Sequence, residues 1–215
     1  MTRFAISAFA LLLLAGCAST NEMVPAAPDP QVQMPPLALR IAILVEEQRL
    51  KLDPKAKALA IDPELTKIAQ ARANDMATKN YLAHAAPNGD TSASLLMADD
   101  AKWQGLLGEN LAAQHYVKQS GVDVDAFAAR FLDEWMKSGP HRENLAYPAY
   151  DRTGVGAAVN GDTVYVAQLF ASDMGLKPLA DENTNTVTSY STPIAAQKGA
   201  PPPPIRLRGA QGVGP

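Results

Sequence analysis

The chain has almost no cysteine: Cys17 is the only one among its 215 residues, so no disulfide can form within the chain. Basic residues are not in excess either, because the formal net charge is −3 and the pI is near 5.6. Proteins that bind nucleic acid neutralise phosphates with clustered lysine and arginine. Nucleic acid is therefore not an expected partner. No repeat at a fixed period is visible, which argues against a repeat architecture.

Long hydrophobic runs are also missing. The apolar run Phe4–Leu14 is too short to span a bilayer as a mature helix. It follows Arg3 and ends at Leu14-Ala15-Gly16-Cys17, which is typical of an export signal and resembles a bacterial lipobox. We expect residues 1–16 to be the signal peptide and Cys17 to become the acylated first residue. Fatty acyl chains such as palmitate, each CH₂ contributing roughly 0.8 kcal/mol, would then hold the protein on a membrane.

Two alternatives remain for this segment, an ordinary secretory peptide that happens to carry a cysteine, or a buried free thiol. Ala18, the residue after Cys17, resembles an outer-membrane sorting signal. The expected location is therefore the bacterial cell envelope, with a lipid anchor in the outer membrane and the protein facing the periplasm.

Proline divides the chain, since twelve of its seventeen prolines lie outside residues 37–172. Residues 17–36 are predicted to form an extended tether, because proline among small and polar residues favours a spacer over a packed element. Residues 173–215 are predicted to be a low-complexity, disordered tail that contains Pro201–Pro204. The interval 37–172 is about the usual size of one domain and is long enough to bury a core.

Hydrophobic periodicity within this interval changes from helical to alternating. The predicted helices are 37–52, a second from Asp62 and Pro63 to about 80–84, 91–103 and 122–137, the last ending at Gly139-Pro140; 111–116 is a possible strand, and 155–159 and 164–170 form a hairpin around Asn160-Gly161-Asp162. This order predicts an α/β (α+β) fold, with helices on the faces of a small, mostly antiparallel sheet.

Three residues gain significance only when they are taken together. Taken singly, His84 would be a histidine at a helix end, Glu109 an exposed turn residue, and His141 a surface loop residue. His115 matches no motif and is interpreted as a solvated strand histidine.

The order of motifs nevertheless resembles that of the CAP superfamily, in its bacterial branch of SCP-domain proteins. The matching elements are Tyr81-Leu82-Ala83-His84, Gly108-Glu109-Asn110-Leu111, Trp135 and Ser138-Gly139-Pro140-His141-Arg142, within a similarity that extends from Ile41 to Phe170. The resemblance implies a three-layer α-β-α sandwich in which His84, Glu109 and His141 converge on one cleft. Animal and plant members usually carry a second glutamate where this chain has Ser138.

Two imidazoles and a carboxylate permit three kinds of chemistry. They can hold zinc, with His84 and His141 as metal ligands; they can exchange protons; or they can bind each other and order a binding groove. Ser138 beside His141 suggests a serine nucleophile, but a serine that caps a helix end is far commoner. We therefore expect His84, Glu109, Ser138 and His141 to bind an envelope component, a peptide or a small apolar or lipid ligand. A zinc-dependent hydrolase or peptidase using the same cleft is the alternative.

Overall fold

The computed structural model describes residues 27–173 and the backbone of residues 207–208. The helices are α1 (Pro30–Leu52), α2 (Pro63–Lys79), α3 (Ser92–Asp99), α4 (Val124–Lys137) and α5 (Gly139–Ala146), and the strands are β1 (Ala60–Ile61), β2 (Gly105–His115), β3 (Arg152–Asn160), β4 (Thr163–Asp173) and β5 (Leu207–Arg208). The predicted signal peptide, Cys17 with its predicted acylation, and most of the predicted tail lie outside these residues.

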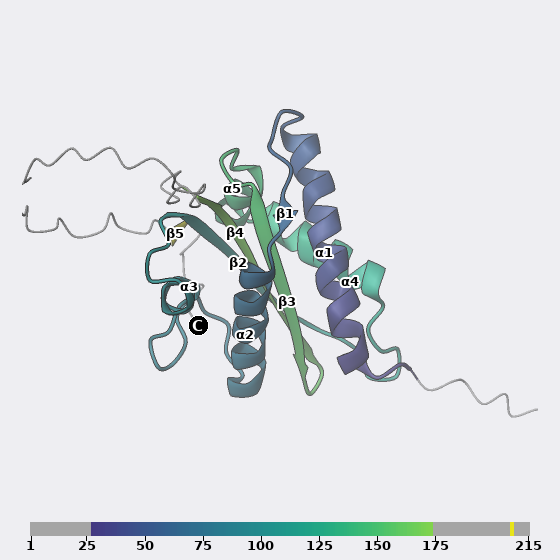
Figure 1. Cartoon of the computed structure of the whole chain (residues 1–215). Coiled ribbons are helices and arrows are strands. Elements are labelled where there is room, and N and C mark those ends of the chain that lie inside the picture. The colour runs from purple at the N-terminus through teal and green to yellow at the C-terminus, as the bar shows by residue number, and fades with distance from the viewer. Residues whose placement is uncertain (1–26, 174–206, 209–215) are drawn as a thin grey trace, which may run out of the picture.

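The strands form one mixed sheet in the order β1-β3-β4-β2-β5. β3, β4 and β2 are antiparallel neighbours over long registers, whereas β1 and β5 each add two parallel residue pairs at the edges. Helices α1, α4 and α5 pack on one face of the sheet, and α2 and α3 pack on the other (Figure 1). The predicted three-layer α-β-α sandwich with a mostly antiparallel sheet is therefore confirmed.

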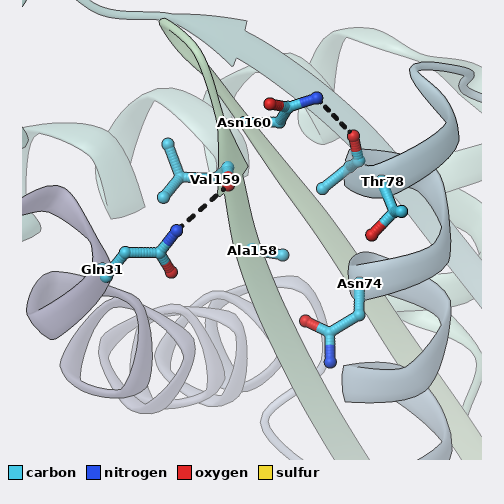
Figure 2. Close-up of a pocket in the computed structure, with 7 residues that line it drawn as sticks. Gln31, Asn74, Thr78, Ala158, Val159 and Asn160 are labelled. Atoms are coloured by element: carbon cyan, nitrogen blue, oxygen red, sulfur yellow. Dashed lines mark hydrogen bonds between the residues drawn. The ribbon is translucent and has the colours of Figure 1, made fainter.

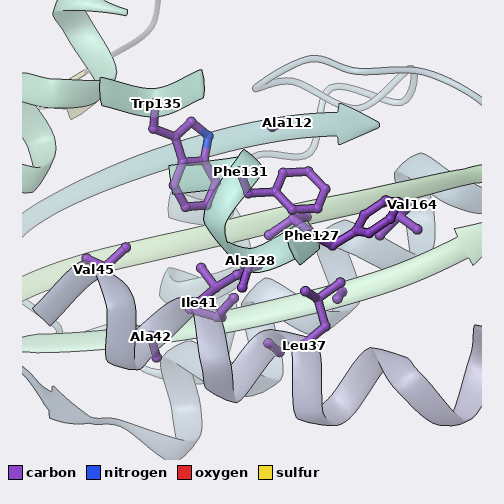
Figure 3. Close-up of a cluster of buried hydrophobic side chains, with 14 of the residues drawn as sticks. Leu37, Ile41, Ala42, Val45, Ala112, Phe127, Ala128, Phe131, Trp135 and Val164 are labelled. Atoms are coloured by element: carbon purple, nitrogen blue, oxygen red, sulfur yellow. The ribbon is translucent and has the colours of Figure 1, made fainter. Parts of the chain in front are cut away.

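Each face of the sheet has its own apolar core. Along β4, Val164, Val166 and Phe170 face the α1–α4 layer, whereas Tyr165, Ala167 and Leu169 face α2 and α3. Figure 3 shows the aromatic stripe of α4 lying over β2 and against α1; Trp135 in this stripe is fully buried and donates its indole N–H to the carbonyl of Leu111 at 3.3 Å. The indole therefore joins α4 to the middle of β2.

The Gly-Val-Gly run of β3 allows α2 to lie directly on the sheet. A Cβ atom on Gly154 would lie 2.2 Å from the backbone nitrogen of Thr66, and one on Gly156 would lie 2.3 Å from that of Gln70. Any side chain at these positions would push α2 away from the sheet. The two glycines therefore fix the depth of α2, which carries part of the site described below.

Several predicted elements are confirmed. Asp62 caps α2 with its carboxylate, which accepts the N–H groups of Glu64 and Leu65 at 2.9 and 3.0 Å, and Pro63 is the first helical residue. The fourth predicted helix corresponds to α4. The hairpin corresponds to β3 and β4, with Gly161 in the left-handed region at a φ of 63°.

The predicted tether is wrong for residues 30–36, because α1 begins at Pro30 rather than at residue 37. The carboxylate of Asp29 accepts the N–H of Gln31 at 2.9 Å, and a proline at the first helical position loses no hydrogen bond. The buried Met34 also packs in the core beside the first predicted helical residues. Burial and capping therefore outweigh the cost of two further prolines inside the helix.

The region around the candidate residues also differs from the prediction. β2 begins at Gly105, six residues before the predicted strand, so that Glu109 lies within a strand and not in a turn. Gly139-Pro140 does end α4, but the same dipeptide opens α5, and His141 is therefore helical and not in a loop. The third helix ends at Asp99 instead of residue 103. β5 shows that residues 207–208 pair with β2, so the predicted tail is not wholly without structure.

Candidate functional site

Glu109 is a buried carboxylate in the middle of β2. Its residue is 3% exposed and its side chain points to the α2–α3 face of the sheet, since it pairs across the sheet with Leu169. One carboxylate oxygen lies 2.6 Å from Nδ1 of His84. The other accepts the hydroxyl of Ser92 and lies 3.6 Å from Nε of Arg72. Both oxygens are thus engaged by groups of the chain, as the burial of a charge requires.

Arg72 supplies the positive charge that offsets Glu109. Its side chain is 1% exposed, and its Nη2 donates to the carbonyls of Ala83 at 2.7 Å and His84 at 3.1 Å. Its Nη1 donates to the hydroxyl of Tyr81 at 3.0 Å. One guanidinium therefore neutralises the carboxylate and also holds the backbone that carries His84.

Tyr81, the first residue of the Tyr81-Leu82-Ala83-His84 element, extends this network. The hydroxyl of Tyr81 donates to the carboxylate of Asp75 at 2.5 Å, and Asp75 in turn pairs with Lys79 at 2.7 Å. Burial, and then the hydrogen bond to Asp75, raise the pKa of Tyr81. Tyr81 therefore stays protonated and holds the segment after α2 against Arg72 and Asp75, two residues of that helix.

The contact with Glu109 determines the tautomer of His84. An ionised carboxylate accepts hydrogen bonds only, so Nδ1 of His84 must carry the hydrogen that lies between them. This leaves Nε2 for contact with a ligand, as an acceptor in the neutral ring and as a donor in the charged ring. The ring is also held in position, with 19% of its side chain exposed. A histidine oriented in this way by a carboxylate suits binding and proton exchange equally.

His141 approaches the same place from α5. Burial lowers the pKa of His141, and the charge of His84 lowers it further. The two imidazoles are therefore close enough to repel each other when both are protonated. Nδ1 of His141 is buried and has no hydrogen-bond partner within residues 27–173. We call His84, Glu109 and His141, together with Arg72 and Ser92, the His/Glu cluster.

Each residue of the Gly-Glu-Asn run has a separate part in assembling this cluster. A Cβ atom on Gly108 would lie 2.5 Å from the hydroxyl of Tyr150, so only glycine leaves room for that ring. Glu109 contacts His84. The amide of Asn110 donates to the carbonyl of His141 at 3.2 Å and accepts from Asn144 of α5 at 2.9 Å. The motif therefore connects β2 to both histidines, one on each side of the strand.

Two other sequence candidates lie apart from these contacts. Ser138 joins α4 to α5: its N–H lies 3.3 Å from the carbonyl of Glu134, and its carbonyl accepts the N–H of Arg142 at 2.9 Å. Its hydroxyl makes no hydrogen bond to His84 or His141 in the part of the chain that the structure describes. His115 is exposed at the far end of β2, where Nδ1 lies 2.9 Å from the hydroxyl of Thr163.

Sequence reasoning missed Arg72 and Ser92, the two groups that hold Glu109. Arg72 had a detectable signal, because it occupies the apolar stripe of α2 between Ile68 and Met76, where a charged residue is unusual. Ser92 had none. It is the first residue of a short helix, where serine is common, and only the fold brings it next to β2.

The donor set does not fit a zinc site. Structural zinc sites use four protein ligands, and catalytic sites usually use three. Both oxygens of Glu109 are occupied by Arg72, Ser92 and His84, which leaves two imidazole nitrogens. Accordingly, residues 27–173 contain no group of three or more His, Cys, Asp or Glu side chains placed to hold a metal ion. The assignment of His84 and His141 as metal ligands is not supported by this arrangement.

A separate groove of about 370 Å³ lies between the start of α1, the end of α2 and the end of β3 (Figure 2). It is lined by uncharged residues: Gln31, Asn74, Ala77, Thr78, Ala158, Val159 and Asn160. Asn160 donates to the carbonyl of Ala77 at 2.7 Å, and Gln31 donates to that of Val159 at 3.3 Å. No residue of the His/Glu cluster lines this groove, so it is a distinct feature of the surface.

The family model described as "CAP: Cysteine-rich secretory protein family" matches residues 54–171. The chain belongs to this family. The match covers every residue of the His/Glu cluster, and the CAP domain is therefore the part of the chain in which His84, Glu109 and His141 are assembled. The CAP fold also accounts for the α-β-α layering described above.

Several relatives of this CAP-domain protein come from bacteria. Over 105 residues, which are 49% of this chain and 37% of the relative, it is 30% identical to "Uncharacterized protein YkwD" of Bacillus subtilis. An extracellular SCP-domain protein of Bacillus anthracis is similar with 29% identity and a TM-score of 0.51, over 68% of this chain and 44% of that chain. The chain thus spans less than half of either relative's length.

An outer surface protein of Borrelia burgdorferi has the same fold, with a TM-score of 0.52 and 23% identity over 67% of this chain and 96% of that chain. These neighbours are an outer surface protein and an extracellular protein. No helix within residues 27–173 is long and apolar enough to cross a bilayer.

Proposed function

We propose that this CAP-domain protein is a lipid-anchored protein of the bacterial cell envelope that uses the His/Glu cluster to bind a polar ligand, for which an envelope peptide fits best. The observation that carries the proposal is the engagement of both oxygens of Glu109. The carboxylate orients His84 and is not itself offered to a ligand, so the two imidazoles are the groups that a ligand would contact.

The polarity of these groups favours a peptide over an apolar molecule. An apolar ligand would cover Nε2 of His84, whose side chain is partly exposed, without giving it a hydrogen bond, which costs free energy. A peptide carries N–H donors and C=O acceptors and can satisfy either protonation state of a ring. Envelope components such as the stem peptides of peptidoglycan have this chemistry.

Binding is also favoured over hydrolysis. The described residues offer no serine paired with an imidazole, because Ser92 donates its hydroxyl to Glu109 and Ser138 makes no hydrogen bond to either ring. The available donors are also too few for a zinc site. A hydrolase would have to use a water molecule that His84 activates as a general base, with Glu109 stabilising the charged imidazole ring. That route needs the same residues, so one experiment can examine both functions.

The test uses the mature protein with ¹⁵N-labelled histidine and three probes: soluble muropeptides, an unrelated tripeptide mixture and palmitate. We expect muropeptides to shift the imidazole resonances of His84 and His141, and the shifts to be absent in Glu109→Gln, which loses the carboxylate that orients His84. The His115 resonance serves as the internal control and should not move.

Three outcomes would contradict the proposal. Shifts with palmitate alone would replace the peptide by an apolar ligand. No shift with any probe would remove the binding role. Cleaved muropeptides in wild-type samples, and intact ones in Glu109→Gln samples, would establish the hydrolase instead.

A further inference from the structure

Helix α1 is apolar on two opposite faces. Leu37, Ile41 and Val45 are fully buried against the sheet and α4. The second face is exposed to solvent and consists of Val32 at 61% exposure, Leu39 at 53%, Ile43 at 41% and Leu50 at 44%. We call these four residues the outer stripe. A helix with apolar residues on both faces is expected to have a partner on each of them.

The spacing of the outer stripe distinguishes it from scattered surface residues. Its members follow one another by seven, four and seven residues. At 3.6 residues per turn they fall in a sector of about 40° centred opposite Ile41. Among the residues that the structure describes, five of the eight large exposed hydrophobic residues belong to α1, Leu52 being the fifth. Such a concentration marks an interaction surface.

Two of the charged residues beside the outer stripe contact other parts of the protein. Nε of Arg40 donates to Asp125 of α4 at 2.6 Å. The carboxylate of Glu46 accepts the N–H of Leu59 at 3.2 Å. Glu47 and Lys51 remain next to the stripe, and their opposite charges are one helical turn apart. An apolar partner therefore meets little net charge along this face.

The position of the proposed anchor identifies the partner. Twelve residues, 18–29, separate Cys17 from the start of α1. Fully extended, they reach at most about 42 Å, and α1 itself is about 35 Å long. An acylated Cys17 would therefore keep the whole outer stripe within about 80 Å of the bilayer, which raises its effective concentration there.

We propose that the outer stripe of α1 lies on the lipid bilayer, with Val32, Leu39, Ile43 and Leu50 in the boundary between head groups and acyl chains. This inference rests on the acylation of Cys17, which belongs to the proposed function. A helix with an apolar stripe adds a second contact to a lipid anchor in this way. Because α1 and α2 cover opposite faces of the sheet (Figure 1), the α2–α3 face, to which Glu109 points, then lies away from the bilayer.

The experiment uses the full mature chain carrying Leu39→Cys, labelled with an environment-sensitive fluorophore. Acylation blocks Cys17, so the label is confined to position 39. The vesicles contain phosphatidylethanolamine and phosphatidylglycerol, with or without brominated acyl chains. We expect brominated lipid to lower the emission by roughly twofold, because the label lies at the acyl boundary. Adding Ile43→Asp to the labelled chain should abolish the quenching.

The matched control is Lys67→Cys on α2, an exposed position in the opposite layer, whose label should not respond to brominated lipid. If the mass of the chain includes the acyl group but brominated lipid does not quench the label at position 39, this inference is wrong. The lipid anchor at Cys17 is then still supported. The label could instead be shielded from water without being quenched by brominated lipid, and become exposed when the protein is diluted. That result would overturn this inference in favour of a second copy of the chain. A mature chain without the acyl mass would overturn the anchor, and this inference with it.

Discussion

Replacing Arg72 by methionine is expected to lower the free energy of unfolding by about 3–5 kcal/mol, because it removes one partner of a buried ion pair. The side chains of Arg72 and Glu109 are 1% and 4% exposed. Methionine fills much of the same volume, but it leaves the carboxylate without its cation and two backbone carbonyls without their donor. Equilibrium unfolding in urea measures the change.

Two further variants show whether the loss comes from the buried charge. In Arg72→Met/Glu109→Gln the orphaned charge is gone, so the double variant should lose less stability than the sum of the two single variants. Strictly additive losses would contradict the pairing. Lys67→Met removes an ion pair with Asp99 that is mostly exposed, and it should cost no more than about 1 kcal/mol.

Gly156→Ala is expected to destabilise the domain by about 3 kcal/mol or more, since its one added methyl group meets backbone that cannot move aside. The Cβ atom would lie 2.3 Å from the nitrogen of Gln70 and 2.4 Å from the carbonyl carbon of Ala69. α2 would have to rise from β3 along its length. Because α2 also carries Arg72, the variant should loosen the His/Glu cluster as well.

Gly139→Ala is the matched control for this substitution. A Cβ atom at Gly139, the first residue of α5, has no neighbour within 4 Å. Alanine there should leave stability unchanged or raise it by at most about 1 kcal/mol, because alanine loses less backbone entropy on folding. Equal losses from the two substitutions, measured by urea unfolding, would mean that α2 does not lie as close to β3 as described.

The elements that could be predicted from the sequence are those whose signals are local. The stripe of α4 and the alternation of β3 and β4 are complete within each segment, and Asp62-Pro63 shows where α2 begins. α5 could not be recognised, because Gly139-Pro140 at the end of one helix is equally typical of the start of a loop. The early start of α1 depends on burial of Met34, which periodicity alone does not show.

The candidate site could be predicted only as far as its motifs reach. The resemblance names His84, Glu109 and His141, and the structure shows the contact between the first two of them. The burial of Glu109 depends on Arg72 and Ser92, which are 37 and 17 residues away in sequence. Partners this distant leave no spacing pattern, and the function of Arg72 is visible only when α2 lies on the sheet. For the same reason the sequence alone predicts an exposed Glu109.

The central claim is that the two imidazoles face one place beside Glu109. The most direct measurement is the pH titration of the ¹⁵N-labelled histidines by NMR in wild type and in His84→Asn. In wild type, burial and the charge of His84 hold the pKa of His141 below its ordinary value of 6.5, so His141 should bind its proton only in more acidic solution than a free histidine.

Removing His84 removes one of these two causes. The pKa of His141 should therefore rise in His84→Asn, while burial keeps it below 6.5. His115, exposed at the other end of β2, is the control, because its resonances at a fixed pH should not move when His84 is replaced. A pKa of His141 that does not respond to the loss of His84 would show that the two rings do not share a site, and it would contradict this account.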